Sequence, residues 1–403
     1  MTDVASDVTR FPLPRECPYH PPSELMQLKD EGPLARVQLW DGSTPWLVTR
    51  YAEQVTLLAD PRLSVNTANP GYPHAHEGSW ERRNDNKGFI KLDDPGHSIQ
   101  RRMLTSSFMT KRVEGMRPRI QQIVDGLIDD MLRTTPPVDL VQAFALPVPS
   151  LVICELLGVP YEEHGFFQQC SNAIVSQTMP GDQVAAAYAD LMGYLQGLIE
   201  AKAANPADDL LSRLATEQVA TGALTLKEAA VMGILILVGG HETTANMISL
   251  GTFTLLQHPD QLAELRACDD PALVNSTVEE LLRLLTINII GRRRVATADI
   301  EIAGTVIRAG EGVIVANDLG NYDESAFDDP FTFDLHRKAR HHLAFGYGAH
   351  QCLGQQLARV ELQVVYGTLY RRIPTLRLAV PAEQVPFKDD MTVYGAYELP
   401  VAW

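Results

Sequence analysis

Residues 345–354 read Phe345-Gly346-Tyr347-Gly348-Ala349-His350-Gln351-Cys352-Leu353-Gly354, and an apolar helical pattern follows from Leu353 to Leu369. Glycines carry no Cβ, so backbone N–H groups in this stretch can approach the sulfur atom closely. The start of the next helix adds partial positive charge, which lowers the pKa of a cysteine. The stretch therefore predicts a loop that holds Cys352 as a thiolate able to bind iron. A buried cysteine that only packs in a glycine turn is the ordinary alternative.

Composition narrows the class of protein. The five cysteines are odd in number and scattered without a CxxC pair, which favours a reducing compartment. The polar, proline-containing start of the chain, Met1 to Glu24, shows no signal peptide. A membrane span would need about eighteen consecutive apolar residues, and no such run occurs. The net charge of −16 argues against non-specific nucleic-acid binding. We expect a cytoplasmic monomer.

The chain is expected to form one domain, residues 1–403, which is mainly α with a small β portion. Residues 1–97 are predicted to be β-rich, with a hairpin formed by 35–40 and 46–49 around Asp41-Gly42 and a mobile substrate loop at about 67–90. Residues 98–403 are predicted to be rich in helix, because apolar residues recur three and four apart. Examples of this spacing are 121–132, 184–203 and 276–285; strands are expected within 300–315, 376–380 and 393–401.

The clearest helix begins at a capping box, Thr225-Leu226-Lys227-Glu228, and runs to His258-Pro259. It is apolar on every side from Ala229 to Gly240, so it should lie in the core. Inside it stands Gly239-Gly240-His241-Glu242-Thr243-Thr244. A buried carboxylate is costly unless it is paired or used, and a threonine can bond back to a carbonyl and leave a groove. A softened helix crossing with a solvated glutamate is the alternative.

The cysteine stretch resembles the haem-binding loop of the cytochromes P-450, the haem-thiolate monooxygenases, at every position of F-G-x-G-x-H-x-C-x-G. The stretch 239–244 resembles the oxygen-binding motif of the same family, (A/G)-G-x-(D/E)-T-T. The resemblance implies that Cys352 is the axial ligand of haem iron, that Thr243 hydrogen-bonds dioxygen and that Glu242 relays protons. Helical spacing puts further residues near the face of Thr243. The predicted substrate pocket is Leu235, Val238, Gly239, Ile290, Val393 and Tyr394.

Two further sets of residues match the family. His97 and Arg101 lie one helical turn apart and, with Arg294 and His350, resemble the residues that bind the haem propionates. Glu280-Leu281-Leu282-Arg283 matches the family's E-x-x-R, and Phe333 to Arg337 contains the later arginine. The resemblance implies an ion network of Glu280, Arg283 and Arg337 that serves folding and haem retention.

The resemblance extends over the whole chain and implies the fold, the cofactor and the partners. The fold is a triangular helical prism with haem b between the long central helix and the cysteine loop. The implied reaction is hydroxylation of an unactivated C–H bond of a hydrophobic secondary metabolite or drug-like compound by dioxygen. Electrons would come from NAD(P)H through a separate reductase and ferredoxin. Because ferredoxins are acidic, we expect a basic docking surface on the cysteine side, with Arg102, Lys111, Arg112, Lys338, Arg340 and Arg359 as candidates.

Three alternatives stay open: a haem-thiolate nitric oxide reductase, a peroxide-driven peroxygenase, and a haem-based sensor or carrier without turnover. The acid and alcohol at Glu242 and Thr243 favour the monooxygenase. Substrate contacts are expected from 67–90, 166–183, 287–290 and 393–394, but these segments do not reveal the substrate. Arg82, Arg83 and Lys87 either meet a polar group on the substrate or face solvent.

Overall fold

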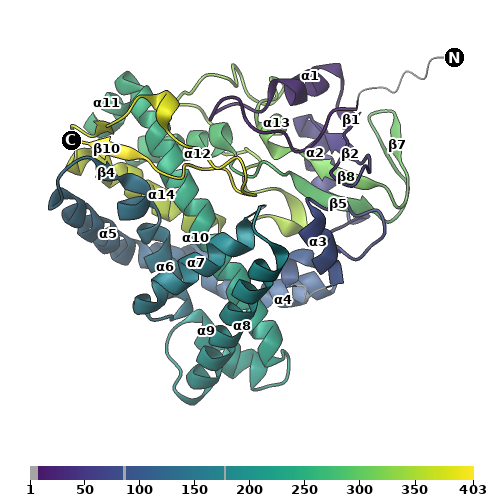
Figure 1. Cartoon of the computed structure of the whole chain (residues 1–403), viewed down its shortest axis with the longest axis horizontal. Coiled ribbons are helices and arrows are strands. Elements are labelled where there is room, and N and C mark those ends of the chain that lie inside the picture. The colour runs from purple at the N-terminus through teal and green to yellow at the C-terminus, as the bar shows by residue number, and fades with distance from the viewer. Residues whose placement is uncertain (1–7, 85–87, 177) are drawn as a thin grey trace.

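The computed structural model describes residues 8–84, 88–176 and 178–403. Within them the protein is mainly helical with small sheets, as predicted (Figure 1). The helices are α1 (Ser23–Glu31), α2 (Tyr51–Ala59), α3 (Glu77–Glu81), α4 (Gly96–Thr105), α5 (Thr110–Leu132), α6 (Pro147–Leu157), α7 (His164–Val175), α8 (Gly181–Ala204), α9 (Leu210–Arg213), α10 (Leu226–Gln257), α11 (Pro259–Ala267), α12 (Pro271–Leu285), α13 (Asn317–Asn321) and α14 (Gln355–Arg372). The strands are β1 (Leu34–Arg36), β2 (Trp46–Val48), β3 (Leu63–Ser64), β4 (Val138–Asp139), β5 (Arg292–Ala296), β6 (Ile300–Ile302), β7 (Thr305–Ile307), β8 (Gly312–Val315), β9 (Arg377–Leu378) and β10 (Pro400–Ala402).

The helix α10 runs through the middle of the molecule (Figure 1). Its predicted capping box is present, because the Thr225 hydroxyl accepts a hydrogen bond from the Glu228 N–H and the Glu228 carboxylate accepts one from the Thr225 N–H. The helices α6, α8, α12 and α14 contact it. Among the described residues, α10 alone is long and apolar enough to cross a membrane, yet 72% of its most apolar window is buried inside the protein. It is therefore the core helix, in agreement with its apolar sequence.

The largest sheet has the strand order β1-β2-β8-β5-β3 and lies at the right of Figure 1. The predicted hairpin is confirmed, with Leu34 opposite Val48, and Gly42 takes a positive φ of 82° in its turn. Strand β5 pairs antiparallel with β8. Because side chains alternate along a strand, Arg292 and Arg294 point to the same side of the sheet. The remaining strands form the sheets β4-β10-β9 and β6-β7.

Several predicted boundaries change. Residues 1–97 are not β-rich, because three helices, α1 to α3, account for more of the segment than its three short strands. The predicted loop at 67–90 contains α3, and Lys87 lies outside the described residues. The predicted helical segments are parts of α5, α8 and α12. The C-terminal strands shrink to β9 and β10, since residues 393–399 make isolated bridges and loop contacts instead of a ladder.

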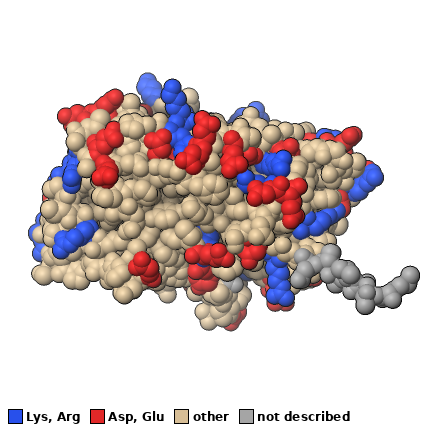
Figure 2. Space-filling view, turned by 90° about the horizontal axis from the view of Figure 1, so that it is seen from above, with Lys and Arg blue, Asp and Glu red and all other residues tan. Residues whose placement is uncertain are grey.

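The chain carries a net charge of −16. On the face shown in Figure 2, acidic and basic side chains are interspersed between broad uncharged areas. An acidic protein can still have local basic areas, because exposed charges more than about 10 Å apart are screened from one another at moderate salt.

Candidate active site

A cavity of about 530 Å³ separates α10 from the loop that carries Cys352. Gly239 and Thr243 of α10 and Cys352 of the loop all line it. Most of the remaining lining is apolar and comes from Leu58, Phe89, Ile90, Ile153, Leu235, Ile290, Leu357 and Val393 among others. A largely apolar cavity with a few polar groups at defined positions is typical of a site for a hydrophobic ligand.

The cysteine loop owes its shape to glycine. Gly346 and Gly348 have positive φ values of 71° and 73°, which side chains rarely adopt. A Cβ on Gly348 would also lie 2.4 Å from the carbonyl oxygen of Leu58. The loop closes where the Cys352 N–H donates to the Phe345 carbonyl at 2.9 Å, and α14 starts three residues after the cysteine. The glycine spacing thus fixes where the sulfur atom sits.

The predicted lowering of the Cys352 pKa is not found in this structure. Burial raises the pKa of this thiol, and the positive charge of Arg292, the N–H of Gly354 and the charges of Arg101 and Arg359 only partly oppose it. Desolvation therefore outweighs the effect of the helix start. A bound metal cation would supply the missing positive charge and ionise the thiol.

The polar stretch in α10 has the expected geometry at Thr243. Its hydroxyl donates to the carbonyl oxygen of Gly239 at 2.7 Å, as the sequence predicted, and both residues face the cavity. A Cβ on Gly240 would lie 2.7 Å from the Cδ1 atom of Ile153 on α6, so a larger residue there would have to displace the end of that side chain. Glu242 does not line the cavity: it is buried on another side of α10, 3.6 Å from the imidazole of His241.

Cationic side chains gather at the end of the cavity nearest the cysteine loop. Arg101, Arg294 and His350 line it, as predicted, and Arg101 donates to the Gln351 carbonyl at 2.6 Å. His97 lies behind them, with its ring 3.9 Å from that of His350. Both ring nitrogens of His97 are buried without a hydrogen-bond partner among the described residues. Burial lowers the pKa of His97, so it is neutral at neutral pH.

Arg292 is a member of this group that the sequence did not single out. It lines the cavity together with Arg293 and Arg294 of β5, and burial lowers the pKa of all three, those of Arg293 and Arg294 to about 10. Its Nε has no hydrogen-bond partner among the described residues. The run of three arginines, Arg292-Arg293-Arg294, was the signal that could have identified it.

Four of the six predicted pocket residues line the cavity: Leu235, Gly239, Ile290 and Val393. Val238 and Tyr394 do not. Val238 packs against the core from a neighbouring face of α10. Tyr394 follows Val393 in an extended segment, so its side chain points the opposite way and stacks on Phe387.

The predicted contact segments contribute unequally to the cavity. Tyr72, Phe89 and Ile90 line it from 67–90, and Ile287, Asn288 and Ile290 line it from 287–290. No described residue of 166–183 lines it. Arg82 and Arg83 do not line it either, and the guanidinium of Arg83 lies over the ring of Trp80.

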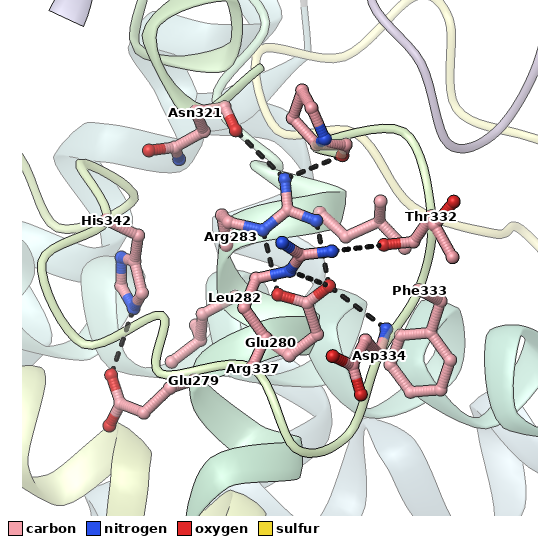
Figure 3. Close-up of polar contacts among 12 residues, drawn as sticks. Glu279, Glu280, Leu282, Arg283, Asn321, Thr332, Phe333, Asp334, Arg337 and His342 are labelled. Atoms are coloured by element: carbon pink, nitrogen blue, oxygen red, sulfur yellow. Dashed lines mark hydrogen bonds and ion pairs between the residues drawn. The ribbon is translucent and has the colours of Figure 1, made fainter. Parts of the chain in front are cut away.

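The predicted ion network is present (Figure 3). Arg283 donates two hydrogen bonds of 2.8 Å to the carboxylate of Glu280, and both side chains are fully buried. Arg337 adds a third, at 3.1 Å. Arg283 also donates to the carbonyl oxygens of Asn321 and Pro330, so it joins α12 to the chain that leads to the cysteine loop.

A second ion network, centred on Glu279, lies behind the cysteine loop. The sequence did not reveal it, and it changes which residues can belong to the predicted docking surface. Glu279 accepts hydrogen bonds from Arg359. Its other partner is His342, as Figure 3 shows. Arg359 is therefore buried in an ion pair and is not a docking residue. Arg112 is half-buried and paired with Asp208. The candidates that remain exposed are Arg102, Lys111, Lys338 and Arg340.

Both the sequence and the structure of this chain are similar to those of known proteins. The family model described as "Cytochrome P450" matches residues 181–393. Cytochrome P450 GfsF from Streptomyces halstedii is 51% identical over 100% of this chain and 98% of its own length, and its crystal structure superposes with a TM-score of 0.93, covering 98% and 100% of the two chains. Vitamin D3 dihydroxylase from Streptomyces griseolus is 49% identical over 100% of both chains. The crystal structure of mycinamicin VIII C21 methyl hydroxylase from Micromonospora griseorubida, bound to mycinamicin VIII, has 41% identity and a TM-score of 0.92, covering 98% and 100%.

Proposed function

The chain belongs to the cytochrome P450 family and is a monooxygenase that carries haem, and from that premise we propose that it hydroxylates an unactivated C–H bond of a hydrophobic secondary metabolite or drug-like compound. The reaction consumes one dioxygen molecule, two electrons and two protons, and yields one hydroxylated product and one water. The apolar lining of the cavity opposite Cys352 supports a hydrophobic substrate. Relatives that are named for the hydroxylation of mycinamicin VIII and of vitamin D3 support the compound class.

The cavity fits an anionic, iron-containing cofactor. Its lining holds Lys91, Arg101, Arg292, Arg293 and Arg294, while Glu361 is the only acidic residue in it within the described part of the chain. Burial raises the pKa of Glu361 well above its usual range, which disfavours a compensating negative charge on this side chain. Buried cations require anionic partners, and the two propionates of haem would satisfy them.

We assign the haem contacts on this basis. Cys352 would ligate the iron, Arg101, Arg294 and His350 would bind propionates directly, and His97 would support His350. When bound, the haem supplies the activation of dioxygen, and a thiolate ligand favours cleavage of the O–O bond. The unpaired ring nitrogens of His97 and the free Nε of Arg292 support a polar partner at this end of the cavity.

Thr243 and Glu242 would deliver the protons that the reaction consumes. The Thr243 hydroxyl faces the cavity, and because its O–H donates to the Gly239 carbonyl, its oxygen is oriented to accept a hydrogen bond from a group in the cavity. Glu242 is the nearest acid along α10 and is buried, which suits a relay shielded from bulk solvent. The observation that carries the proposal is that Thr243 and Cys352 line the same cavity.

Electrons would arrive from a ferredoxin that docks over the cysteine loop. The exposed Arg102 on α4 and the exposed Lys338 and Arg340, which precede the loop, support a basic surface for an acidic partner. A cytoplasmic location is supported by the absence of disulfides, since all five cysteines are free.

The test is turnover with isotopically labelled dioxygen. The holoprotein is mixed with ferredoxin, reductase and NAD(P)H, and hydrophobic compounds that shift the spin state of the haem are chosen as substrates. We expect a product with one labelled oxygen atom and consumption of one NAD(P)H per product. Product formation with peroxide alone and without reductant would favour the peroxygenase, and binding without any oxygenated product would favour the sensor or carrier.

A further inference from the structure

Glu242 has a buried cationic partner from a distant part of the chain. The ammonium of Lys388 lies 3.7 Å from one carboxylate oxygen of Glu242 and donates to the side-chain carbonyl of Asn246 at 3.1 Å. Lys388 is 6% exposed and Glu242 1% exposed. Buried lysines are rare and costly, so a lysine directed at the acid of the active site requires an explanation.

A C-terminal hairpin, residues 386–397, delivers this lysine. Its two arms are joined by the bridge between Phe387 and Ala396 and by the hydrogen bond from the Lys388 N–H to the Gly395 carbonyl. Gly395 packs so tightly on α10 that a Cβ there would lie 2.1 Å from the side chain of Asn246. The hairpin therefore seats the ammonium against Glu242 with little freedom.

The cluster also reaches the protein surface. Beyond Lys388, the exposed Asp389 and the half-exposed Asp390 follow in sequence, and the hydroxyl of Tyr397 bonds to Asp390. At its inner end, one carboxylate oxygen of Glu242 has no hydrogen-bond partner among the described residues. Burial, together with Asp390, raises the pKa of Asp389, which suits a group that takes up protons from solvent.

We propose that Lys388 is the positioning residue of Glu242: its ion pair holds the carboxylate toward the C-terminal hairpin, which is the side from which protons enter. The inference rests on the proposed function. In each transfer an O–H bond forms on a carboxylate oxygen of Glu242 and breaks when the proton passes on toward the hydroxyl of Thr243. The electrons of the reaction come from the redox partner, so the transfer itself changes no oxidation state.

The first test is infrared spectroscopy of the resting holoprotein, which needs no turnover. In Lys388→Met, Glu242 loses its cation and should become protonated, giving one additional carboxylic-acid band. That band should be absent from the wild-type protein and from the double variant Lys388→Met/Glu242→Gln. The matched control is Lys29→Met on α1, because Lys29 is also 6% exposed and also lies 3.7 Å from one carboxylate oxygen, that of Asp30.

The second test measures coupling, the amount of product formed per NAD(P)H consumed, with ferredoxin, reductase and a compound that the wild-type protein hydroxylates. Lys388→Met should lower kcat by at least about tenfold, raise the solvent deuterium isotope effect and divert reducing equivalents to peroxide, while KM stays within about twofold. Lys388→Arg should recover most of the coupling, and Lys29→Met should behave as wild type. If Lys388→Met does not fold, Lys388→Arg and the double variant are compared instead, with the double variant expected to melt close to the wild-type temperature.

An unchanged infrared spectrum in a folded Lys388→Met, or coupling equal to that of the wild type, overturns the proposal. The two failures are separable: if the wild-type protein forms no oxygenated product, the proposed function is wrong, and the infrared comparison still decides whether Lys388 controls the charge of Glu242.

Discussion

Arg359 and Glu279 form a two-point ion pair, with hydrogen bonds of 2.6 and 3.0 Å, directly behind the cysteine loop. The guanidinium also lies over the ring of Phe345, the first residue of the loop, at 4.6 Å from its centroid. A side chain that looks like surface charge in the sequence therefore joins α12, α14 and the loop that carries the sulfur.

The Arg359–Glu279 pair should make the free energy of unfolding fall as the pH is lowered into the acid range. Burial acts to raise the pKa of Glu279, but hydrogen bonds from His342 and Arg359 lower it from 4.5 to about 2. Its stabilising contribution, about 3 kcal/mol, is therefore complete above pH 4.5 and is lost as the pH falls toward 2. Glu279→Gln should be less stable than the wild type at pH 7 by about this amount, and the difference should shrink on acidification. Urea unfolding over this pH range measures it, and parallel pH curves for the two proteins would contradict the prediction.

Substituting Arg283 in the Glu280–Arg283 pair should lower the free energy of unfolding more than substituting Glu279 does. Arg283→Met removes two hydrogen bonds from the buried carboxylate of Glu280, which keeps those from Arg337 and the Asp334 N–H, and removes the donor to two buried carbonyls; breaking such a buried pair costs about 3–5 kcal/mol. Arg283→Lys should not restore stability, because a single ammonium cannot make the four hydrogen bonds of the guanidinium. Thermal melting and the rate of haem transfer to apomyoglobin give the two readouts. Normal melting with normal haem retention would show that the pair is dispensable.

Thr243→Ala should uncouple the enzyme. Loss of the hydroxyl at the cavity removes the group that passes protons on, so reducing equivalents should appear as hydrogen peroxide and product per NAD(P)H should fall at least about tenfold. Thr254→Ala is the matched control, because its hydroxyl makes the same bond to the fourth preceding carbonyl on α10, at 2.8 Å, but lies outside the cavity. Peroxide and product are quantified together, and unaltered coupling in Thr243→Ala would refute the role.

Charge reversal should slow electron delivery. Combining Arg102→Glu with Lys338→Glu and Arg340→Glu should reduce the rate of haem reduction by ferredoxin roughly tenfold at low salt. The difference should fade at high ionic strength, because exposed charges are then screened. Arg377→Glu, an exposed position on β9, is the control. Stopped-flow reduction at several salt concentrations tests this, and equal rates for the triple variant at low salt would place the docking surface elsewhere.

The elements that could be predicted from the sequence are those with strong local signals. The capping box of α10 and the glycines of the cysteine loop each require one backbone geometry, and both appear as predicted. The Glu280, Arg283 and Arg337 network was identified through family resemblance, because an E-x-x-R spacing alone is common in helices.

The predictions that differ from the structure concern residues whose surroundings are set by tertiary packing. Whether Arg359 faces solvent depends on Glu279, eighty positions away in the chain. The pKa of Cys352 depends on its burial in the folded protein, which no local pattern reports. Lys388 reaches Glu242 only because the C-terminal hairpin folds onto α10. Such long-range contacts leave no periodic trace in the sequence.

The central claim is that the sulfur of Cys352 ligates the haem iron as a thiolate. The most direct measurement is the absorption difference spectrum of the reduced holoprotein with carbon monoxide. The account predicts the red-shifted band of a thiolate-ligated haem in the wild type and its loss in Cys352→His. A wild-type spectrum typical of histidine-ligated haem, or a protein that binds no haem, would contradict it.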